Sequence, residues 1–489
     1  MPSDHNSQDI SANGPAYAFP ATSHLDPGYH FPKHPDRTVH IPSTVIQGML
    51  RVALGHHQAG RLIEAEQIYR RILAIDNRQP DCLHLLGMIA FQAGRADAAV
   101  EMIRNAIAIN QKQAAYHSNL GTVLQSQGEL DEAAKCYERA LALQPDLAEV
   151  HTNLGNILQA RDQLDEAVAS HERALALKPG LAEAHYNLGL AQLLKGDFSS
   201  GWPNLEWRWQ TRDHETPMRL YPQPFWTGEK LASGRLLIWG EQGIGDEIMF
   251  AGLIPDAIRT GNRCVLDCDP RLRPLFARSF PGVDVICGHN SEVDIAAHLP
   301  SGSLPHLFRA TTAAFAATTS PYLTADPVAR ERFRTGYADG KRIIGLAWHT
   351  TNRKTGRERS IDLSLFAPLF AREDIRWISL QYGNHRELES QAAAARAPIF
   401  IDHSVDQLSN IDMFAAQVAA MDMVITIDNS TAHLAGALGV PAWVLLPFAR
   451  DWRWLQARAD SPWYPTLHLF RQPTPGDWQS VVQSVESAL

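Results

Sequence analysis

The sequence predicts an α-solenoid of helical repeats followed by two α/β domains of the doubly wound type. Two observations predict this fold class: residues recur every 34 positions in the first half, and short apolar strands alternate with helices after Trp226. A lead-in rich in Pro, His, Ser and Asp precedes the repeats, and we expect it to be disordered. The expected segments are residues 1–42 (lead-in), 43–215 (repeats), 230–335 (first α/β domain) and 340–489 (second α/β domain).

The repeat is defined by small residues at fixed positions. Each unit reads as two amphipathic helical segments joined by a glycine-containing turn. Small residues let the two helices approach closely. The pattern resembles the tetratricopeptide repeat, and about five units match it. Three series keep the 34-residue step: Gly87, Gly121, Gly155 and Gly189; Gly60, Gly94 and Gly128; Ala65, Ala99, Ala133 and Ala167.

Arrays that resemble this one offer a concave groove for peptide segments. We therefore expect a protein or peptide partner; the alternative is that the array only joins copies of the chain into a homo-oligomer. Asn119, Asn153 and Asn187 share the 34-residue step on the first helix of their units. Such asparagines can hold an extended peptide backbone by hydrogen bonds, or they can satisfy neighbouring helix ends. The last unit is atypical, with Trp202 and Trp209, and suits a cap that packs on the next domain.

Three polar loops follow apolar strands in the second half. Parallel sheets bind ligands beyond the carboxyl ends of their strands, so these loops are the candidate site. They are Gly240–Glu247, His349–Ser360 and Asp428–His433. The first loop lacks the spacing of a dinucleotide fingerprint. Its acids, Glu241, Asp246 and Glu247, either cap the next helix or include a general base.

The second loop is basic. It holds Arg353, Lys354, Arg357 and Arg359 within seven residues, directly after an apolar strand. Cations at this position would hold a diphosphate and neutralise a leaving group. The alternative is a solvated charged surface.

The third loop begins a helix of small residues in ITIDNSTAHLAGALGVPAWVLLP. A helix N-terminus presents free N–H groups and partial positive charge, which suit a phosphate. A helix cap alone explains one polar residue, whereas this loop has several. We expect a phosphorylated ligand to bind Asp428, Asn429, Ser430, Thr431 and His433.

At these loops the chain resembles metal-independent glycosyltransferases of the GT-B fold, which have two facing Rossmann-like domains. It is closest to the bacterial heptosyltransferase-like family. The family's Asp-Thr-Gly-x-x-His-Leu motif matches Asp428, His433 and Leu434, with Asn429 and Ser430 in place of Thr and Gly. The family's Gly-Asp pair matches Gly245 and Asp246, and the resemblance implies that Asp246 is the catalytic base.

The resemblance also covers the closing segment LLPFARDWRWLQARADSPWYPTLHLFRQ, which looks like that of repeat-fused proteins, some of which modify flagellin. The arrangement is similar to O-linked N-acetylglucosamine transferase as well. It implies that Lys354 or Arg359 is the phosphate cation and that no metal or other cofactor is needed. We read Asp267-Cys268-Asp269 as a strand end and turn rather than a metal motif.

Composition excludes several other classes. The 489 residues carry a formal net charge of -9, so a general nucleic-acid binder is not expected. No apolar run reaches the ~18 residues of a membrane span, and no secretory signal is visible. The five cysteines are scattered and indicate neither disulfides nor a zinc site. We expect a cytoplasmic protein.

Together with the repeats and the polar loops, the family resemblance implies an inverting glycosyltransferase that moves a sugar from a nucleotide-sugar to a protein acceptor held by the repeats. One alternative is a transferase for a lipid or saccharide acceptor. Another is a non-catalytic scaffold with a degenerate transferase domain, which Asn429 and Ser430 favour because they depart from the motif.

Overall fold

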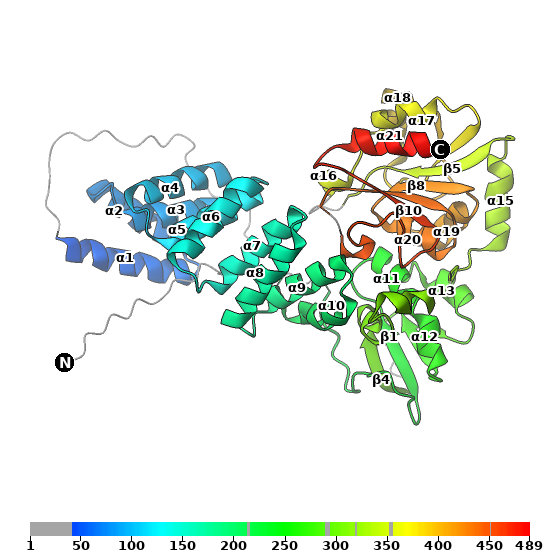
Figure 1. Ribbon diagram of the computed structural model, residues 1–489, viewed down its shortest axis with the longest axis horizontal. Helices are drawn as coiled ribbons and strands as arrows, with labels where there is room; N and C mark the ends of the chain where they lie inside the picture. The colour runs from blue at the N-terminus through cyan, green and yellow to red at the C-terminus, as the bar shows by residue number, and fades with distance from the viewer. Residues whose placement is uncertain (1–41, 213–215, 289–293, 318–319, 352–355, 450) are drawn as a thin grey trace. The chain divides into compact units, whose positions relative to one another are not determined.

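The computed structural model describes residues 42–212, 216–288, 294–317, 320–351, 356–449 and 451–489. The predicted lead-in lies outside the described residues except for Pro42. The chain divides into two compact units, residues 1–157 and 158–489, with the boundary inside helix α7 (Figure 1).

The first unit consists of antiparallel helix pairs. Within a pair, the glycines of the 34-residue series lie where the two helices touch. A side-chain carbon added at Gly87 would lie 2.8 Å from Ile103 Cγ1, and one added at Gly121 would lie 2.7 Å from Tyr137 Cε1. The periodic glycines are therefore required by helix packing. The helices are α1 (Ser43–Gln58), α2 (Leu62–Ile75), α3 (Pro80–Gln92), α4 (Ala96–Ile109), α5 (Ala114–Ser126), α6 (Leu130–Leu143) and α7 (Ala148–Ala160).

The turns inside the pairs explain the second glycine series. Gly60, Gly94 and Gly128 have φ of 75°, 75° and 82°, in the left-handed region where glycine is favoured. Asp162 holds the same position in the fourth pair with φ 65°. Aspartate tolerates this conformation better than most residues, which explains why the repeat survives without glycine there.

The second unit begins with helices that complete the repeats. They are α8 (Leu164–Leu177), α9 (Ala182–Lys195), α10 (Phe198–Leu205) and the 3₁₀ helix η1 (Glu206–Gln210). Trp202 of α10 is 1% exposed, and its indole N–H donates to the Arg309 carbonyl at 2.8 Å. Its ring meets that of Trp452 edge-on at 5.5 Å. The atypical last repeat thus packs on the α/β part of the same unit, as the sequence indicated.

A four-stranded parallel sheet forms the first α/β lobe, with strand order β3-β2-β1-β4. Short helices connect its strands. Its strands are β1 (Arg235–Trp239), β2 (Cys264–Asp267), β3 (Asp284–Ile286) and β4 (Ile295–Pro300), and its helices are α11 (Ile244–Ala251), α12 (Ile254–Arg259), α13 (Arg273–Ser279) and α14 (Leu304–Phe308).

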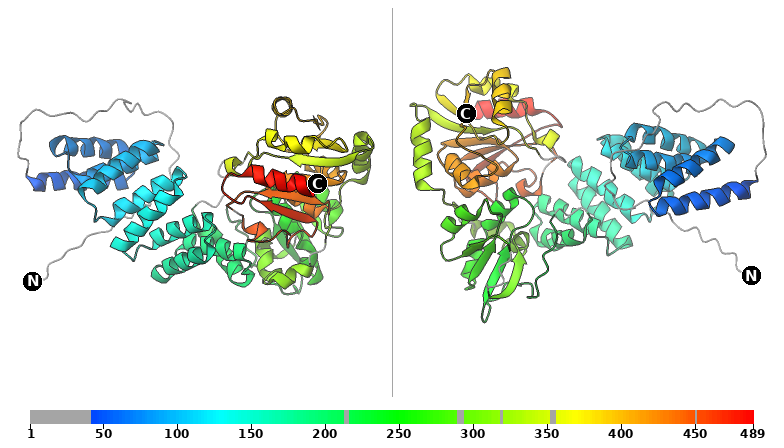
Figure 2. Two further views of the ribbon diagram at one scale, coloured as in Figure 1. Left: turned by 45° about the horizontal axis from the view of Figure 1, so that its top comes forward. Right: turned by 180° about the vertical axis from the view of Figure 1, so that it is seen from behind.

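A six-stranded parallel sheet forms the second lobe, with strand order β10-β9-β8-β5-β6-β7. Along β5, Ile344 and Leu346 pack on one face while Ile343 and Ala347 pack on the other, so both faces are buried. Figure 2 shows helix α21 lying along this sheet, where Trp478 joins its core. The strands are β5 (Arg342–Ala347), β6 (Ile375–Ser379), β7 (Ile399–Phe400), β8 (Met423–Ile427), β9 (Ala442–Leu446) and β10 (Leu467–Arg471). The helices are α15 (Pro327–Tyr337), α16 (Gly356–Arg359), α17 (Ala367–Phe370), α18 (His385–Ala394), α19 (Ile411–Ala419), α20 (Ser430–Ala437) and α21 (Trp478–Ala488).

The two sheets share one topology. Numbered within each lobe, the orders are 3-2-1-4 and 3-2-1-4-5-6, the second being the order of the doubly wound dinucleotide-binding fold. Strand order reverses between β1 and β4 in one lobe and between β5 and β8 in the other. Ligands bind at such switch points, so the loops after these strands are the expected site.

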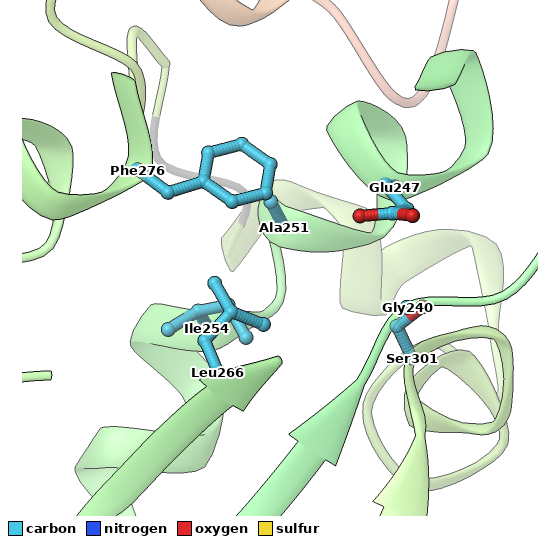
Figure 3. A pocket seen from close by; sticks show the side chains of 7 residues that line it. All are labelled: Gly240, Glu247, Ala251, Ile254, Leu266, Phe276 and Ser301. Carbon is cyan, nitrogen blue, oxygen red and sulfur yellow. The ribbon is translucent and has the colours of Figure 1, made fainter. Parts of the chain in front are cut away.

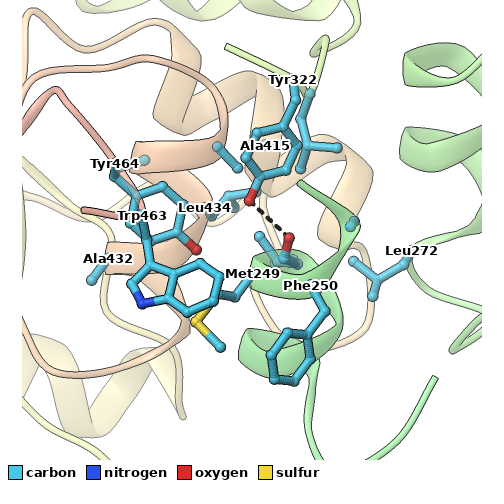
Figure 4. Close-up of a cluster of buried hydrophobic side chains, with 14 of the residues drawn as sticks. Met249, Phe250, Leu272, Tyr322, Ala415, Ala432, Leu434, Trp463 and Tyr464 are labelled. Carbon is cyan, nitrogen blue, oxygen red and sulfur yellow. Dashed lines mark hydrogen bonds between the residues drawn. The ribbon is translucent and has the colours of Figure 1, made fainter. Parts of the chain in front are cut away.

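The lobes pack together through helices α11 and α20. Met249 and Phe250 of α11 share a buried cluster with Leu434 of α20 and Tyr464 (Figure 4). The Tyr322 hydroxyl, from the segment that links the lobes, donates to the Ile248 carbonyl at 2.8 Å. The amino ends of both helices therefore meet at the carboxyl ends of the two sheets.

Candidate functional site

The Asp428–His433 loop forms the start of α20 directly after β8. Asn429 caps the helix, since its Oδ1 accepts the Thr431 N–H at 2.9 Å and the Thr426 hydroxyl at 3.1 Å. Among the described residues, Asn429 Nδ2 and Thr431 Oγ1 have no hydrogen-bond partner although both are buried. Buried polar atoms without partners are rare and costly. Two such atoms at a helix N-terminus fit a ligand that supplies the partners.

Asp428 is 4% exposed and lies beside two donors. Its Oδ1 accepts the indole N–H of Trp454 at 2.8 Å, and its Oδ2 lies 3.2 Å from Arg359 Nη1. Burial raises the pKa of Asp428, and Arg359 opposes that rise. The carboxyl is thus held firmly in place between the basic loop and the segment after β9.

His433 is buried among protein groups. Its Nδ1 is hydrogen-bonded to the Tyr464 hydroxyl at 3.0 Å, and its ring stacks on Trp454 at 5.2 Å. Burial, and then the charge of Arg453, lower the pKa of His433 to about 4. The ring is therefore neutral near pH 7.

Asp246 lies in the first turn of α11, in the other lobe. Its Oδ1 accepts Arg453 Nε at 3.1 Å and also Arg453 Nη2. Arg453 Nη1 bonds both oxygens of Asp451, at 2.8 and 3.0 Å. Arg359 Nη2 lies 3.4 Å from Asp451 Oδ2 and so joins the same group. We name Asp246, Arg359, Asp428, Asp451 and Arg453 the central ion cluster.

Asp451 is kept ionised by the two arginines of this cluster. Burial alone would raise its pKa, but Arg453 and Arg359 together lower the pKa of Asp451 to about 2. Asp451 also caps the 3₁₀ helix η5 (Trp452–Trp454) by accepting the Arg453 N–H at 3.0 Å. It therefore fixes where the Arg453 side chain begins.

At this cluster, the start of α11 touches the start of α20. A side-chain carbon added at Gly245 would lie 3.1 Å from His433 Cδ2 and 3.7 Å from Ser430 Cα. Glycine at 245 is thus needed for the first and third loops to touch. The small residues of α20 serve the same packing, because the Gly436 face lies against the Tyr464 ring. These small residues make room for protein side chains.

Glu241, one of the candidate bases, is committed elsewhere. It is 1% exposed and receives Arg208 Nε and Nη2 at 2.9 and 2.8 Å and the Gly302 N–H at 2.9 Å. A buried carboxylate with these partners holds the structure together and cannot reach a substrate. This geometry is evidence against Glu241 as the base.

Glu247 occupies a different environment on the same helix. Its Oε2 accepts the Asp269 N–H at 2.9 Å, and burial raises the pKa of Glu247 to about 7. It lines a small pocket at the ends of β1 and β4 (Figure 3). The Ser301 hydroxyl in that pocket has no partner among the described residues. The other lining residues are Gly240, Ala251, Ile254, Leu266 and Phe276.

The basic loop is only partly described. Arg353 and Lys354 lie outside the described residues. Arg357 is exposed, while Arg359 is half-buried in the central ion cluster. Of the two residues considered for the phosphate cation, Arg359 is thus the one whose position is known.

The Asp-Cys-Asp sequence at 267–269 ends strand β2, as expected. Asp267 accepts Arg219 Nη1 and the Gly288 N–H, and Asp269 accepts Arg271. In the described part of the chain, no group of three or more His, Cys, Asp or Glu side chains is placed to hold a metal ion.

The repeat asparagines differ from one another. Asn119 is buried, and its Nδ2 lies 2.7 Å from His84 Nε2. Asn153 bonds Tyr137 and is half-buried, as is Asn187. A peptide-binding role for the three stays a prediction, and Asn119 would have to exchange its bond to His84 to take part.

Sequence reasoning missed Asp451, Arg453, Trp454 and Tyr464. All four lie in the closing segment that carried part of the family resemblance, but that segment has no periodic pattern. Its alternation of charged and aromatic residues, RDWRW, was the available signal. Leu455, next to it, has φ 52°, a strained conformation for leucine and common near functional sites.

Comparison with known proteins supports the tetratricopeptide repeats expected in the first half of the chain. Residues 82–146 and 112–179 match the model of the tetratricopeptide repeat. The helix pairs there are tetratricopeptide repeats, and proteins with such repeats bind peptides or other proteins. No helix among the described residues is both long and apolar enough to cross a membrane.

One curated relative covers more of the chain. Protein FlbA of Caulobacter vibrioides (strain ATCC 19089 / CIP 103742 / CB 15) is 29% identical over 323 residues, which are 61% of this chain and 53% of that protein. The chain thus matches about half the length of this relative.

Two solved structures are similar to about a third of this chain. A crystal structure of MamA is 22% identical and covers 32% of this chain and 90% of its own, with a TM-score of 0.29. The crystal structure of YrrB, "a TPR protein with an unusual peptide-binding site", is 21% identical and covers 34% and 89%, with a TM-score of 0.30.

Proposed function

We propose that the chain is a metal-independent, inverting glycosyltransferase of the GT-B type that moves a sugar from a nucleotide-sugar to a protein bound by the repeats. The observation that carries this proposal is the start of α20. There, Asn429 Nδ2 and Thr431 Oγ1, which have no partner among the described residues, lie at a helix N-terminus beside Asp428 and Arg359. This start follows β8, at the switch point of a sheet with the nucleotide-binding strand order.

The chemistry would use both lobes. Asp246 of the first lobe accepts the proton of the acceptor hydroxyl while the acceptor oxygen bonds the anomeric carbon of the sugar. The bond from that carbon to the diphosphate breaks, and its electron pair leaves with the diphosphate. The N–H groups of α20 and the arginines of the central ion cluster stabilise the leaving group. His433, neutral because burial and Arg453 keep its pKa near 4, serves as a hydrogen-bonding group rather than a cation.

Nucleotide binding is the first experiment. A thermal-shift series with uridine, guanosine, cytidine and adenosine diphosphates identifies the base, and calorimetry then gives affinities. Asp428→Ala and His433→Ala should each weaken binding by about 10- to 100-fold, since a lost contact costs about 1–3 kcal/mol. Asp374→Asn is the control, because Asp374 is exposed and pairs with Arg372 on the surface. Unchanged affinity in both site variants would remove this site.

Turnover tests the base. Asp246→Asn keeps the size of the side chain and its capping ability, and should lower turnover by about 100-fold with donor affinity not weakened. Turnover should survive excess chelator. Near-normal turnover in Asp246→Asn would move the base to Glu247, because Glu241 is tied to Arg208.

A shortened chain that tests whether the repeats bind the acceptor must keep the second unit whole. Trp202 and Arg208 are buried in the second unit, so a chain that begins after residue 215 would lose part of its core. A chain of residues 158–489 keeps that unit whole. It should bind nucleotide as the full chain does but lose transfer to the protein acceptor. Equal transfer by both chains would favour a lipid or saccharide acceptor and leave assembly to the repeats.

A non-catalytic scaffold is the second candidate. The observation that favours it is that the Asp246 carboxylate is already bound by Arg453. In addition, Gly245 packs on His433, so the starts of α11 and α20 are in contact. A scaffold of this kind predicts no thermal shift with any of the four nucleotides.

A further inference from the structure

Arg453 connects the two lobes through one guanidinium group. It belongs to η5 of the second lobe, whereas its partner Asp246 belongs to α11 of the first. Its Nε and Nη2 both point to Asp246 Oδ1, and Nη1 is held separately by Asp451. Nη2 also lies 3.4 Å from Gln242 Oε1. The guanidinium therefore binds Asp451 of its own lobe on one side, and Asp246 and Gln242 of the first lobe on the other.

The start of α20 lies within electrostatic reach of that guanidinium. The charge of Arg453 acts on both His433 and Asp428, where it helps to lower the pKa of His433 and opposes the rise in the pKa of Asp428. The next residue, Trp454, bonds Asp428 and stacks on the His433 ring. An anion that partnered Asn429 Nδ2 and Thr431 Oγ1 would therefore enter the field of Arg453.

Asp246 and such an anion require the same donors. The pair Nε and Nη2 forms the planar fork that binds carboxylate or phosphate oxygens in a bidentate manner. While Asp246 holds that fork, its Oδ1 accepts two N–H groups and its Oδ2 accepts the Gly243 N–H at 3.3 Å, so the carboxylate is a weaker acceptor for the proton of an incoming hydroxyl. The ligand and the carboxylate thus compete for one arginine.

We propose that Arg453 is an exchangeable cation. With no anion bound it is held by Asp246, and a diphosphate bound at the start of α20 takes over its Nε and Nη2 donors and so releases the Asp246 carboxylate. This inference rests on the proposed function in taking the anion to be a diphosphate. It adds a coupling: the Asp246 carboxylate becomes free to act as a base only when the donor is in place.

Linkage gives the exchange an unusual signature. If Asp246 competes with the ligand, removing its charge must strengthen ligand binding. Asp246→Asn should therefore bind diphosphate about 3- to 10-fold tighter than the wild type. Arg453→Gln should bind at least 10-fold more weakly, and Arg453→Lys should fall between Arg453→Gln and the wild type, because lysine keeps a charge but not the fork.

Calorimetric titration of the full chain with inorganic pyrophosphate and with uridine and guanosine diphosphates tests this. Arg458→Gln is the matched control, since Arg458 pairs with Asp460 near the surface of the same segment and should bind as the wild type does. Circular dichroism checks that each variant is folded. If Arg453→Gln does not fold, the affinity of Arg453→Lys shows whether Arg453 takes part in diphosphate binding. Wild-type affinity in the Arg453 variants, or weaker binding in Asp246→Asn, overturns the exchange alone. Failure of the wild type to bind any diphosphate overturns the proposed function as well.

Discussion

Two carboxylates of one loop in the second unit each bind an arginine, yet the two ion pairs differ in exposure and in how completely they are hydrogen-bonded. Glu241 and Asp246 both follow strand β1. Glu241 meets Arg208, whose five N–H donors all have acceptors: two Glu241 oxygens, Glu206, Ser303 and the Leu205 carbonyl. The side chains of this pair are 1% and 0% exposed. We name it the Arg208 cluster.

The central ion cluster is more open. The side chains of Arg453 and Asp246 are 13% and 18% exposed. At the start of α20, directly after Asp428 of this cluster, Asn429 Nδ2 and Thr431 Oγ1 lack partners within the described residues. A buried ionic group with every donor and acceptor paired maintains structure, whereas one beside unpaired atoms tolerates an energetic cost that a ligand would relieve. Charge alone does not separate the two roles; the completeness of hydrogen bonding does.

The largest expected effect is on stability, in the Arg208 cluster. Arg208→Met leaves the buried Glu241 carboxylate without its cation, and should lower the free energy of unfolding by about 3–5 kcal/mol. Arg453→Met in the central ion cluster should cost only about 1–2 kcal/mol, because its partners are partly exposed to water. Urea unfolding of both variants gives the two values. Equal losses would mean that the clusters do not differ as described.

The fold of the second half followed from local patterns. The strand expected at Leu236–Trp239 is β1, and the apolar run that ends at Ile427 is β8. Parallel order then brings the loops after them to the sheet edges. Helix α11 begins at Ile244 with Gly243 as its N-cap residue, so none of the three candidate acids occupies the N-cap position. Sequence patterns locate elements well because periodicity is a local property.

The site was predictable only in part, for the same reason. Asp246, Arg359, Asp428 and His433 all lie at strand ends, so topology alone places them near one another. Which acid is free is decided by partners far along the chain. Arg208 is 33 residues from Glu241, and Arg453 is 207 residues from Asp246. No spacing rule encodes those pairings, so the sequence left the choice of base open.

Glu247 provides a third acid on the same loop, and it sharpens the comparison because no described arginine bonds to it. Burial raises its pKa from 4.5 to about 7. An acid whose pKa is raised by folding gives stability that is complete below pH 4.5 and is lost as pH rises to about 7. Over this window the wild type should lose about 2 kcal/mol relative to Glu247→Gln, allowing for partial exposure. Unfolding of both proteins at pH 5 and pH 8 measures the difference, and parallel pH curves would contradict it.

A matched pair of threonines tests whether unpaired atoms mark the ligand. Thr431 Oγ1 has no partner among the described residues, so Thr431→Val should change stability by no more than about 0.5 kcal/mol. It should nevertheless weaken diphosphate binding about 10-fold, or about 1.4 kcal/mol. Thr426 is the control, because its hydroxyl donates to the Ile427 carbonyl and Asn429 Oδ1. Thr426→Val should destabilise the protein by about 1–2 kcal/mol. Full diphosphate affinity in Thr431→Val would remove Oγ1 from the binding site.

Salt should produce the smallest difference between the clusters. Between 0.1 M and 1 M sodium chloride the screening length falls from about 10 Å to about 3 Å, and screening acts on groups that water reaches. The cost of Arg453→Met should therefore decrease by a few tenths of a kcal/mol, because water contacts both Arg453 and Asp246. The cost of Arg208→Met should stay constant, since Arg208 and Glu241 are closed to solvent. The quantity to compare is the difference between wild type and variant in the same buffer, which cancels the general effect of salt on folding. If both costs fell by the same amount, water would reach the Arg208 cluster too, and exposure could not be what makes Arg453 available for exchange.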